Sequence, residues 1–238
     1  MIKMDKERRE RIQSRDVELI TNYSSKSPLA EAYRTLRTNI EFLSPDDPLE
    51  TMVITSSVPQ EGKSITIANL AVSMAENGQQ VIVIDADMRK PMQHRIFEIT
   101  NFGGLSDLLT GELNFAEGLQ KTNIEGISLI SGGNVPPNPA ELLGSQKMEE
   151  VIKQAENKAD IVLIDSPPVI AVTDSRLLAN KVDGVMLVVA AQETDEEALA
   201  KSQQMLEKVQ ANVIGTVLTK YPAEESNSYY SGYYNYYG

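Results

Sequence analysis

Short, continuous apolar runs recur through the middle of the chain, and segments with helical periodicity lie between most of them. The runs are rich in valine and isoleucine and mostly lack polar residues at alternate positions, which is typical of strands covered on both faces. They span 51–57, 80–86, 126–131, 160–166, 184–190 and 212–219. Alternation of strands and helices predicts an α/β fold with a parallel sheet between two helical layers. Ligands of such sheets bind at the carboxyl ends of the strands.

Helix-start signals support this arrangement. Ser27 and Pro28 provide an N-cap and a first helical residue for a helix over 27–43. Its apolar residues fall on one stripe at helical spacing: Leu29, Tyr33, Leu36, Ile40 and Leu43. Further helices are predicted after Lys63, from Asn138 as N-cap with Pro139 and Glu141 behind it, and from a capping box spanning Thr194 to Glu197.

Composition divides the chain into three parts. Residues 1–26 mix charges densely and are predicted to form a flexible or conditionally helical arm. Residues 27–220 hold the predicted domain. Residues 221–238 contain too little aliphatic side chain to form a core, which predicts a flexible tail. Most of the tyrosines lie there: Tyr229, Tyr230, Tyr233, Tyr234, Tyr236 and Tyr237.

Charge and residue usage exclude several classes of function. A net charge of -12 argues against nucleic-acid binding, which requires a basic face. The absence of cysteine excludes disulfides and thiolate chemistry, and a single histidine argues against a histidine-rich metal site. No apolar run reaches membrane-spanning length, and the start of the sequence lacks a signal-peptide apolar segment. A cytoplasmic location is therefore expected.

A phosphate-loop pattern lies between the first predicted strand and the helix that follows it. The residues Gly62, Lys63 and Ser64 come where the strand ends and the helix begins, so backbone N–H groups there can cradle phosphates. The lysine would reach the β- and γ-phosphates, and the serine hydroxyl would bind Mg²⁺. The full motif requires glycine at position 57, where this chain has serine. The predicted nucleotide-binding residues are Ser57, Val58, Pro59, Gln60, Glu61, Gly62, Lys63, Ser64 and Ile65.

Aspartates end two later strands at the same edge of the predicted sheet. Asp85 and Asp87 follow one apolar run, and Asp165 ends another. Carboxylate oxygens are the ligands that Mg²⁺ prefers, held directly or through water. One such aspartate would be weak evidence, because turn residues and helix caps are often aspartate. Three beside a phosphate loop predict a nucleotide site.

The combined motifs resemble the Walker A, A′ and B motifs of the bacterial tyrosine kinases of capsule and exopolysaccharide systems. The matching segments are TSSVPQEGKS, VIVIDADMRKP and VLIDSPP. The resemblance extends to SGGNVPPNPAELL and to the tyrosine tail, and so covers residues 27–238. Gln60 is a departure, since the family usually has glycine there, and a positive φ would strain glutamine. The resemblance implies a P-loop NTPase-type fold, protein-tyrosine kinase activity, and ATP and Mg²⁺ as cofactors.

Roles for individual residues also follow from the resemblance. Lys63 is implied to neutralise phosphate charge, Asp85 to act as the base or to orient the incoming tyrosine hydroxyl, and Asp87 to lie near the metal or the acceptor. The implied Mg²⁺ ligands are Ser64, Asp87 and Asp165. A phenol with a pKa of about 10 needs only a well-placed carboxylate for phosphoryl transfer. Arg89 and Lys90 either assist phosphate or acceptor binding or remain solvated charges.

Glu31, Arg34 and Arg37 lie off the apolar stripe of the first helix, at a spacing of three residues. Such a pattern forms pairs on a solvated helix face. In the family that the chain resembles, this pattern packs subunits side by side into a ring, for which bidentate arginine–carboxylate contacts are suited. The resemblance predicts a homo-oligomeric ring in which each subunit phosphorylates the tail tyrosines of the next. Each phosphotyrosine adds about -1.5 to -2 charges, which we expect to drive the ring apart.

Partners follow from the same resemblance. The chain resembles the split form of the family, in which a membrane-embedded polysaccharide co-polymerase supplies an activating cytoplasmic segment. We therefore expect recruitment to the inner face of the plasma membrane and a cognate phosphotyrosine phosphatase. One alternative is a partition- or division-type ATPase switch, although those proteins carry a signature lysine at the position of Val58. A second alternative is a non-enzymatic adaptor that nucleotide assembles into a ring.

Overall fold

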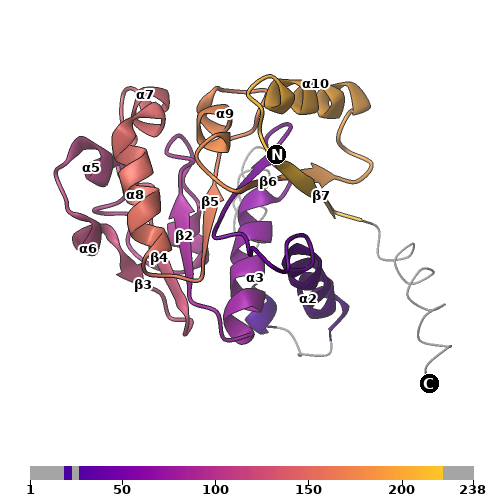
Figure 1. The fold of residues 1–238 in the computed structure, drawn as a ribbon, viewed down its shortest axis with the longest axis horizontal. Helices are drawn as coiled ribbons and strands as arrows, with labels where there is room; N and C mark the ends of the chain where they lie inside the picture. Colours follow the sequence, from indigo (N-terminus) through magenta and orange to yellow (C-terminus); the bar gives the residue numbers. More distant parts are fainter. Residues whose placement is uncertain (1–18, 23–26, 222–238) are drawn as a thin grey trace, which may run out of the picture.

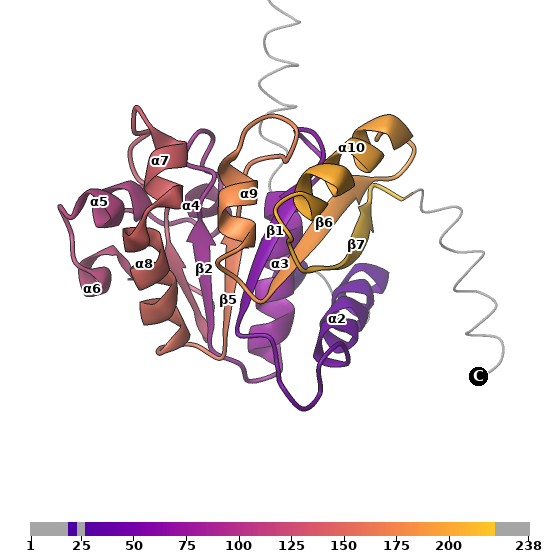
Figure 2. The ribbon, with the colours of Figure 1, turned by 45° about the horizontal axis from the view of Figure 1, so that its top comes forward.

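A seven-stranded sheet lies between two layers of helices in the part of the chain that the structure describes (Figures 1 and 2). The structure is a computed structural model, and it describes residues 19–22 and 27–221. The strand order is β3-β4-β2-β5-β1-β6-β7. The bounds are β1 Thr51–Ser56, β2 Val81–Asp85, β3 Gln120–Lys121, β4 Ile127–Ile130, β5 Ile161–Asp165, β6 Gly184–Ala190 and β7 Val213–Thr219.

Every predicted strand is present, and the prediction of an α/β fold is confirmed. The six predicted strands pair parallel as expected, and a further short strand that was not predicted, β3, pairs antiparallel with β4 at one edge. The short β3 has only two residues, too few to produce an apolar run that sequence reasoning could recognise. The five remaining strand pairs are parallel, so their carboxyl ends meet at one edge of the sheet.

Helices cover both faces because successive strand residues point to opposite sides. Val53 and Ile164 belong to one apolar core, whereas Met52 and Leu163 belong to the other. The first core is covered by α5 Leu105–Thr110, α6 Phe115–Gly118, α7 Pro139–Gly144, α8 Gln146–Glu156, α9 Asp174–Ala179 and α10 Glu196–Glu207. The second is covered by η1 Ile20–Asn22, α2 Pro28–Glu41, α3 Lys63–Glu76 and α4 Gln93–Ile96.

Two of the three predicted N-cap positions are confirmed. Ser27 caps α2 by accepting a hydrogen bond from the Ala30 N–H at 3.1 Å. Asn138 precedes α7 as predicted, but its side chain donates to the Glu141 carboxylate rather than capping the backbone. The predicted capping box at Thr194 is wrong. Asp195 caps α10 instead, because the Thr194 hydroxyl is engaged elsewhere in the molecule.

Part of the predicted amino-terminal arm is folded against the domain. Leu19 and Ile20 are buried in the second core. The Ile20 N–H donates to the Asn69 side chain of α3 at 2.7 Å. Arm residues 1–18 and 23–26, and the tail residues 222–238 with their six tyrosines, lie outside the described residues. Among the described residues, no helix has the length and apolar character needed to cross a membrane.

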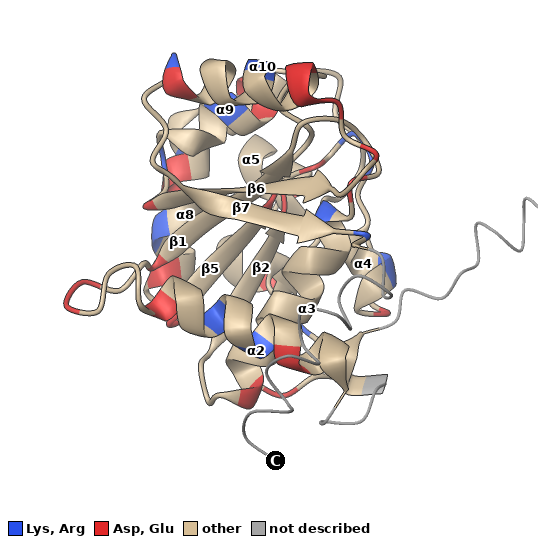
Figure 3. Ribbon diagram, turned by 90° about the vertical axis from the view of Figure 1, so that its right-hand side faces the viewer, with Lys and Arg blue, Asp and Glu red and all other residues tan. Residues whose placement is uncertain are grey.

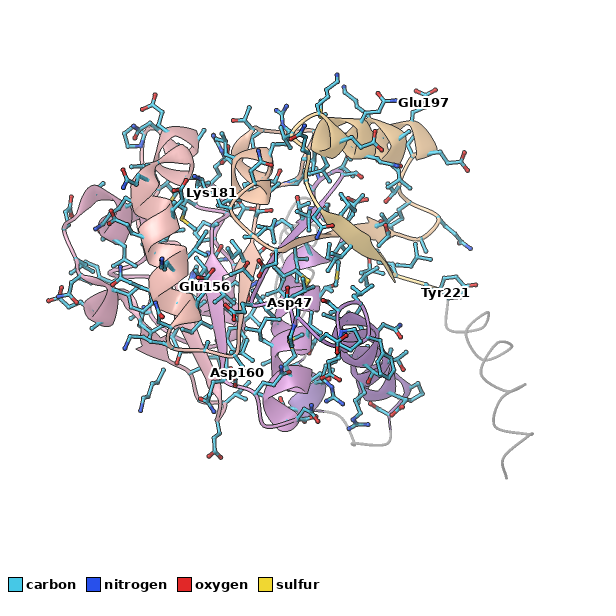
Figure 4. All side chains as sticks on the ribbon, viewed as in Figure 1. Asp47, Glu156, Asp160, Lys181, Glu197 and Tyr221 are labelled. Atoms are coloured by element: carbon cyan, nitrogen blue, oxygen red, sulfur yellow. The ribbon has the colours of Figure 1, made fainter. Side chains whose placement is uncertain are left out.

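The last strand, β7, forms one edge of the sheet, with α10 on one side of it and α2 on the other (Figure 3). Tyr221 follows this strand at the periphery of the molecule and is half exposed (Figure 4). The tyrosine-rich tail therefore starts from the edge of the domain.

Candidate nucleotide-binding site

The loop between β1 and α3 leaves a helix N-terminus without a side-chain cap. Gly62 is the N-cap residue, with a φ of 89°, and no side chain caps the first turn. The N–H groups of that turn therefore keep their capacity to bind an anion, and the helix dipole favours negative charge there. This geometry supports the sequence-based prediction of a phosphate-binding loop.

Gln60 adopts the conformation that its position in the motif demands. Its φ is 68°, in the left-handed region that glycine tolerates and other residues rarely adopt. Left-handed backbone in a non-glycine residue stores strain and is found most often at functional sites. Gln60 thus adopts a backbone conformation that glycine would adopt with less strain.

Glu61 ties the loop to two distant strand ends. Its buried carboxylate accepts hydrogen bonds from the Val58 N–H at 2.8 Å and from the Thr194 hydroxyl. The hydroxyl of Thr219, at the end of β7, donates to the Glu61 carbonyl at 2.6 Å. The Ala190 N–H donates to the Thr194 hydroxyl at 3.0 Å. Sequence reasoning missed this clamp, because its members are separated by more than a hundred residues.

Replacement of Thr194 by valine is expected to loosen the loop. The change keeps the side-chain shape but leaves the Glu61 carboxylate and the Ala190 N–H each without one partner. We expect a loss of about 1–3 kcal/mol in the free energy of unfolding, together with weaker ATP binding. Urea unfolding and a nucleotide titration would measure both. Thr110→Val, at an exposed threonine, is the matched control, and equal results for the two variants would contradict the proposed clamp.

Lys63 lies between two carboxylates from different strands. Its ammonium group is 2.9 Å from Asp87 and 3.0 Å from Asp165. Burial alone would lower the pKa of Lys63, but the two carboxylates outweigh it and raise that pKa above its usual value. The amine therefore stays charged. Its position at the start of α3 is the one from which a lysine neutralises bound phosphate.

Gln93 also belongs to the site, although no sequence pattern singles it out. Its amide nitrogen donates to the second oxygen of Asp165 at 2.7 Å and to the Ser64 carbonyl at 3.0 Å. Its side chain therefore holds the strand-end aspartate against the first turn of α3. Asp165 is fully buried, so both of its oxygens are fixed by these contacts.

The predicted metal ligands fit Mg²⁺. Asp87, Asp165 and the Ser64 hydroxyl lie around Lys63, whose ammonium is 3.4 Å from that hydroxyl. Among the described residues there is no cluster of three or more acidic, histidine or cysteine side chains that could hold a metal alone. Two carboxylates and a hydroxyl suit Mg²⁺, which keeps several waters and takes further ligands from phosphates.

Asp85 occupies a different position from Asp87. It is fully buried, and one oxygen accepts hydrogen bonds from the N–H groups of Met92 and Gln93, each at 2.9 Å. Its other oxygen has no hydrogen-bond partner among the described residues. In the sheet register Asp85 lies beside Asp165. Burial raises the pKa of Asp85 well above its usual range, and the Asp165 carboxylate adds to this effect.

This raised pKa makes stability depend on pH. Between the unfolded pKa of about 3.9 and the raised folded pKa, the folded chain binds more protons at Asp85 than the unfolded chain. Stability is therefore lost as pH rises through that window. Asp85→Asn removes this titration, so its free energy of unfolding should fall less than that of the wild type between about pH 5.5 and pH 8. Urea unfolding measures it, and equal pH slopes would contradict the assignment.

A cavity of about 500 Å³ opens beside these residues. It is lined by Pro59, Gln60 and residues 62–65 of the phosphate loop, and by Asp87, Arg89 and Lys90. Asp85 does not line it. Arg89 is held by a bidentate contact with the fully buried Asp174, at 2.9 and 3.2 Å. Its guanidinium thus fixes the loop after β2 to the start of α9.

The predicted interface residues lie together on α2. Arg34 pairs with Glu31 at 3.2 Å within the same helix. Arg37 donates to the Ser73 carbonyl of α3 at 2.8 Å and lies 3.5 Å from Glu41. The helix therefore presents Glu31 and Arg34 on its exposed side, while Arg37 is largely engaged within its own subunit. Their role in assembly remains a prediction.

Comparisons with known proteins bear on the whole domain. Residues 52–218 match a family model described as an AAA domain. Tyrosine-protein kinase YwqD of Bacillus subtilis (strain 168) is 40% identical over 209 residues, which cover 88% of this chain and 87% of that protein. The crystal structure of the chimerical protein CapA2B2 is 37% identical, with a TM-score of 0.82, over 86% of this chain and 90% of the other.

A more distant likeness concerns the fold alone. The septum site-determining protein MinD from Pyrococcus horikoshii OT3, complexed with Mg-ADP, is 23% identical with a TM-score of 0.62. That match covers 75% of this chain and 76% of the other. This division-type ATPase thus shares the architecture, whereas the sequence identity is higher to YwqD and to CapA2B2.

Proposed function

The chain belongs to the bacterial tyrosine-protein kinase family, and on that premise we propose that it transfers the γ-phosphoryl group of ATP to tyrosines of its own carboxyl-terminal segment. The observation that carries this proposal is the placement of Lys63. A buried, charged lysine lies between two strand-end carboxylates, at a helix N-terminus that opens onto a cavity. Phosphoryl transfer consists mainly of positioning and charge stabilisation, and this arrangement supplies both.

In the proposed reaction the phenol oxygen of a tyrosine forms a bond to the γ-phosphorus of ATP. The bond from that phosphorus to the β–γ bridging oxygen breaks, ADP leaves with the electron pair, and the phenolic proton passes to a carboxylate. Asp85, with its raised pKa and unpartnered oxygen, remains the proposed proton acceptor, and Asp87 is the carboxylate that faces the cavity. Mg²⁺ bound at Ser64, Asp87 and Asp165 would neutralise phosphate charge.

The proposed setting is the regulation of capsule or exopolysaccharide synthesis at the membrane. A membrane-embedded partner with a cytoplasmic activating segment would recruit and stimulate the chain, and a phosphotyrosine phosphatase would reset it. Glu31, Arg34 and Arg37 would join subunits into a ring. The position of Tyr221, which follows β7 at the edge of the domain, supports access of the segment after it to a neighbouring subunit.

The experiment that tests this function compares ADP release with phosphotyrosine formation. Wild-type chain with Mg-ATP and an activating segment should form phosphotyrosine in step with ADP until the tail is modified. A variant with phenylalanine at all six tail tyrosines should form far less phosphotyrosine. Continued ADP release with an unmodified wild-type tail would instead favour the ATPase switch, and neither product would favour the adaptor.

A further inference from the structure

The cavity beside the phosphate loop has an apolar wall that phosphate binding does not explain. Two segments contribute to it. One runs from the end of β2 into α4, and the other joins β5 to α9. Its members are Met92, Ile96, Pro167, Pro168, Ala171 and Val172. Phosphates and Mg²⁺ require charged and polar partners, which other lining residues of the cavity, such as Lys63 and Asp87, already offer. The apolar wall is therefore available to an apolar part of a ligand.

The position of the wall indicates which end of the nucleotide it borders. The backbone of a phosphate loop cradles the α- and β-phosphates, while its lysine reaches the β- and γ-phosphates. Lys63 points to Asp87 and Asp165, which precede the two wall segments in sequence. The wall therefore continues from the γ-phosphate side of the site, where an acceptor must approach in line with the leaving group.

The wall is held in place by contacts to the rest of the site. The Val169 N–H donates to the Ser56 carbonyl at 2.8 Å, which attaches the segment after β5 to the end of β1. The bidentate contact between Arg89 and Asp174 joins the two wall segments. A surface fixed in this way can select a ligand by shape, because little conformational entropy is lost when the ligand binds.

We propose, resting on the proposed kinase function, that this wall is the subsite for the aromatic ring of the acceptor tyrosine. An aromatic ring has an apolar body and a polar tip, so its body can pack on the wall while its hydroxyl points toward the strand-end aspartates Asp85 and Asp87. A serine hydroxyl, attached to a single carbon, leaves the wall uncovered. The wall thus accounts for selection of tyrosine over serine and threonine.

Charge at the cavity mouth fits the same acceptor. Lys90 is exposed and lines the cavity, and within the described part of the chain it has no ion-pair partner. In the sequence, Glu224 and Glu225 precede the first acceptor, Tyr229, by a few residues. A tail that places a tyrosine on the wall brings acidic residues near this lysine.

The test uses the full chain with phenylalanine at the six tail tyrosines, so that only an added peptide with the sequence of residues 222–238 can accept phosphate. In this background Val172→Ser should raise the half-saturating peptide concentration about ten-fold, because a pocket loses roughly 10- to 200-fold in selectivity per apolar group. Val172→Ile, which keeps the wall apolar, should not. Val213→Ser, at an exposed valine of β7, is the matched control.

Met92→Gln, on the other segment of the wall, provides a second measurement should Val172→Ser fail to fold, and nucleotide affinity is measured separately for every variant. If both polar variants saturate at the same peptide concentration as the parent chain, the subsite is wrong while the kinase function stands. If the wild type forms no phosphotyrosine even on its own tail, the proposed function fails first. If the peptide is not accepted, the same wall substitutions are made in the chain that keeps its six tail tyrosines, and the rate of own-tail phosphorylation decides.

Discussion

Replacement of Lys63 by methionine is expected to reduce phosphotyrosine formation by about 100- to 1,000-fold. Among the described residues, the Lys63 ammonium group contacts the carboxylates of both Asp87 and Asp165. It lies where the charge that develops on the transferred phosphoryl group must be stabilised. Methionine has a similar length and keeps the packing of the stem, so the loss reports on charge. Quantitative detection of phosphotyrosine at saturating ATP measures it.

The same change should also lower stability, because it leaves Asp87 and Asp165 without their buried counter-charge. Breaking one side of a buried ion pair costs about 3–5 kcal/mol. Lys147→Met is the matched control, since that lysine is exposed on α8 and, among the described residues, pairs only with Glu150. If Lys63→Met formed phosphotyrosine as fast as the wild type, the proposed role of the phosphate-loop lysine would be wrong.

The largest effect on the fold is expected from Gly104→Ala. A Cβ atom at this position would lie 2.3 Å from both the Gly133 nitrogen and the Ser131 carbonyl oxygen. Both are backbone atoms, so neither can move aside as a side chain would. The segments must separate, which breaks the hydrogen bond from the Leu105 N–H to Ser131. We expect a loss of about 3 kcal/mol or more in the free energy of unfolding, measured by urea denaturation.

Phosphotyrosine formation should fall together with stability, because the displaced segment packs on the loop after β2 that carries Asp87. A Cβ on the neighbouring Gly132 would lie 2.7 Å from Pro91, which shows how closely this turn packs on the residues after Asp87. Gly215→Ala is the matched control, since a Cβ there meets nothing within 4 Å. A Gly104→Ala chain as stable as the Gly215→Ala chain would show that the two segments do not pack as described.

Sequence reasoning located the strands and the phosphate loop because both depend on local pattern. The buried strands read as continuous apolar runs, and Gly62, Lys63 and Ser64 are adjacent in the chain. The residues that it missed act across long separations. Glu61 meets Thr194 and Thr219, and Gln93 meets Asp165, only after the sheet brings distant strand ends together.

Errors arose where a local signal competed with a tertiary contact. Thr194 has the spacing of a capping box, yet its hydroxyl binds the buried Glu61 carboxylate, and Asp195 takes the capping position. The charged amino-terminal segment is predicted to form a flexible or conditionally helical arm, and charge pattern alone does not reveal that Leu19 and Ile20 bury apolar side chains against α3. Asp85 and Asp87 are equivalent in sequence pattern and both are buried, but only the folded structure shows that Asp87 lines the cavity while Asp85 does not.

Phosphotyrosine mapping by mass spectrometry tests the central claim most directly. The purified full chain is incubated with Mg-ATP and an activating segment, and the peptides spanning Tyr229 to Tyr237 are examined for added phosphate. We predict phosphate on several of these tyrosines, formed only when ATP is present. ATP consumption with every one of these tyrosines unmodified would contradict the account.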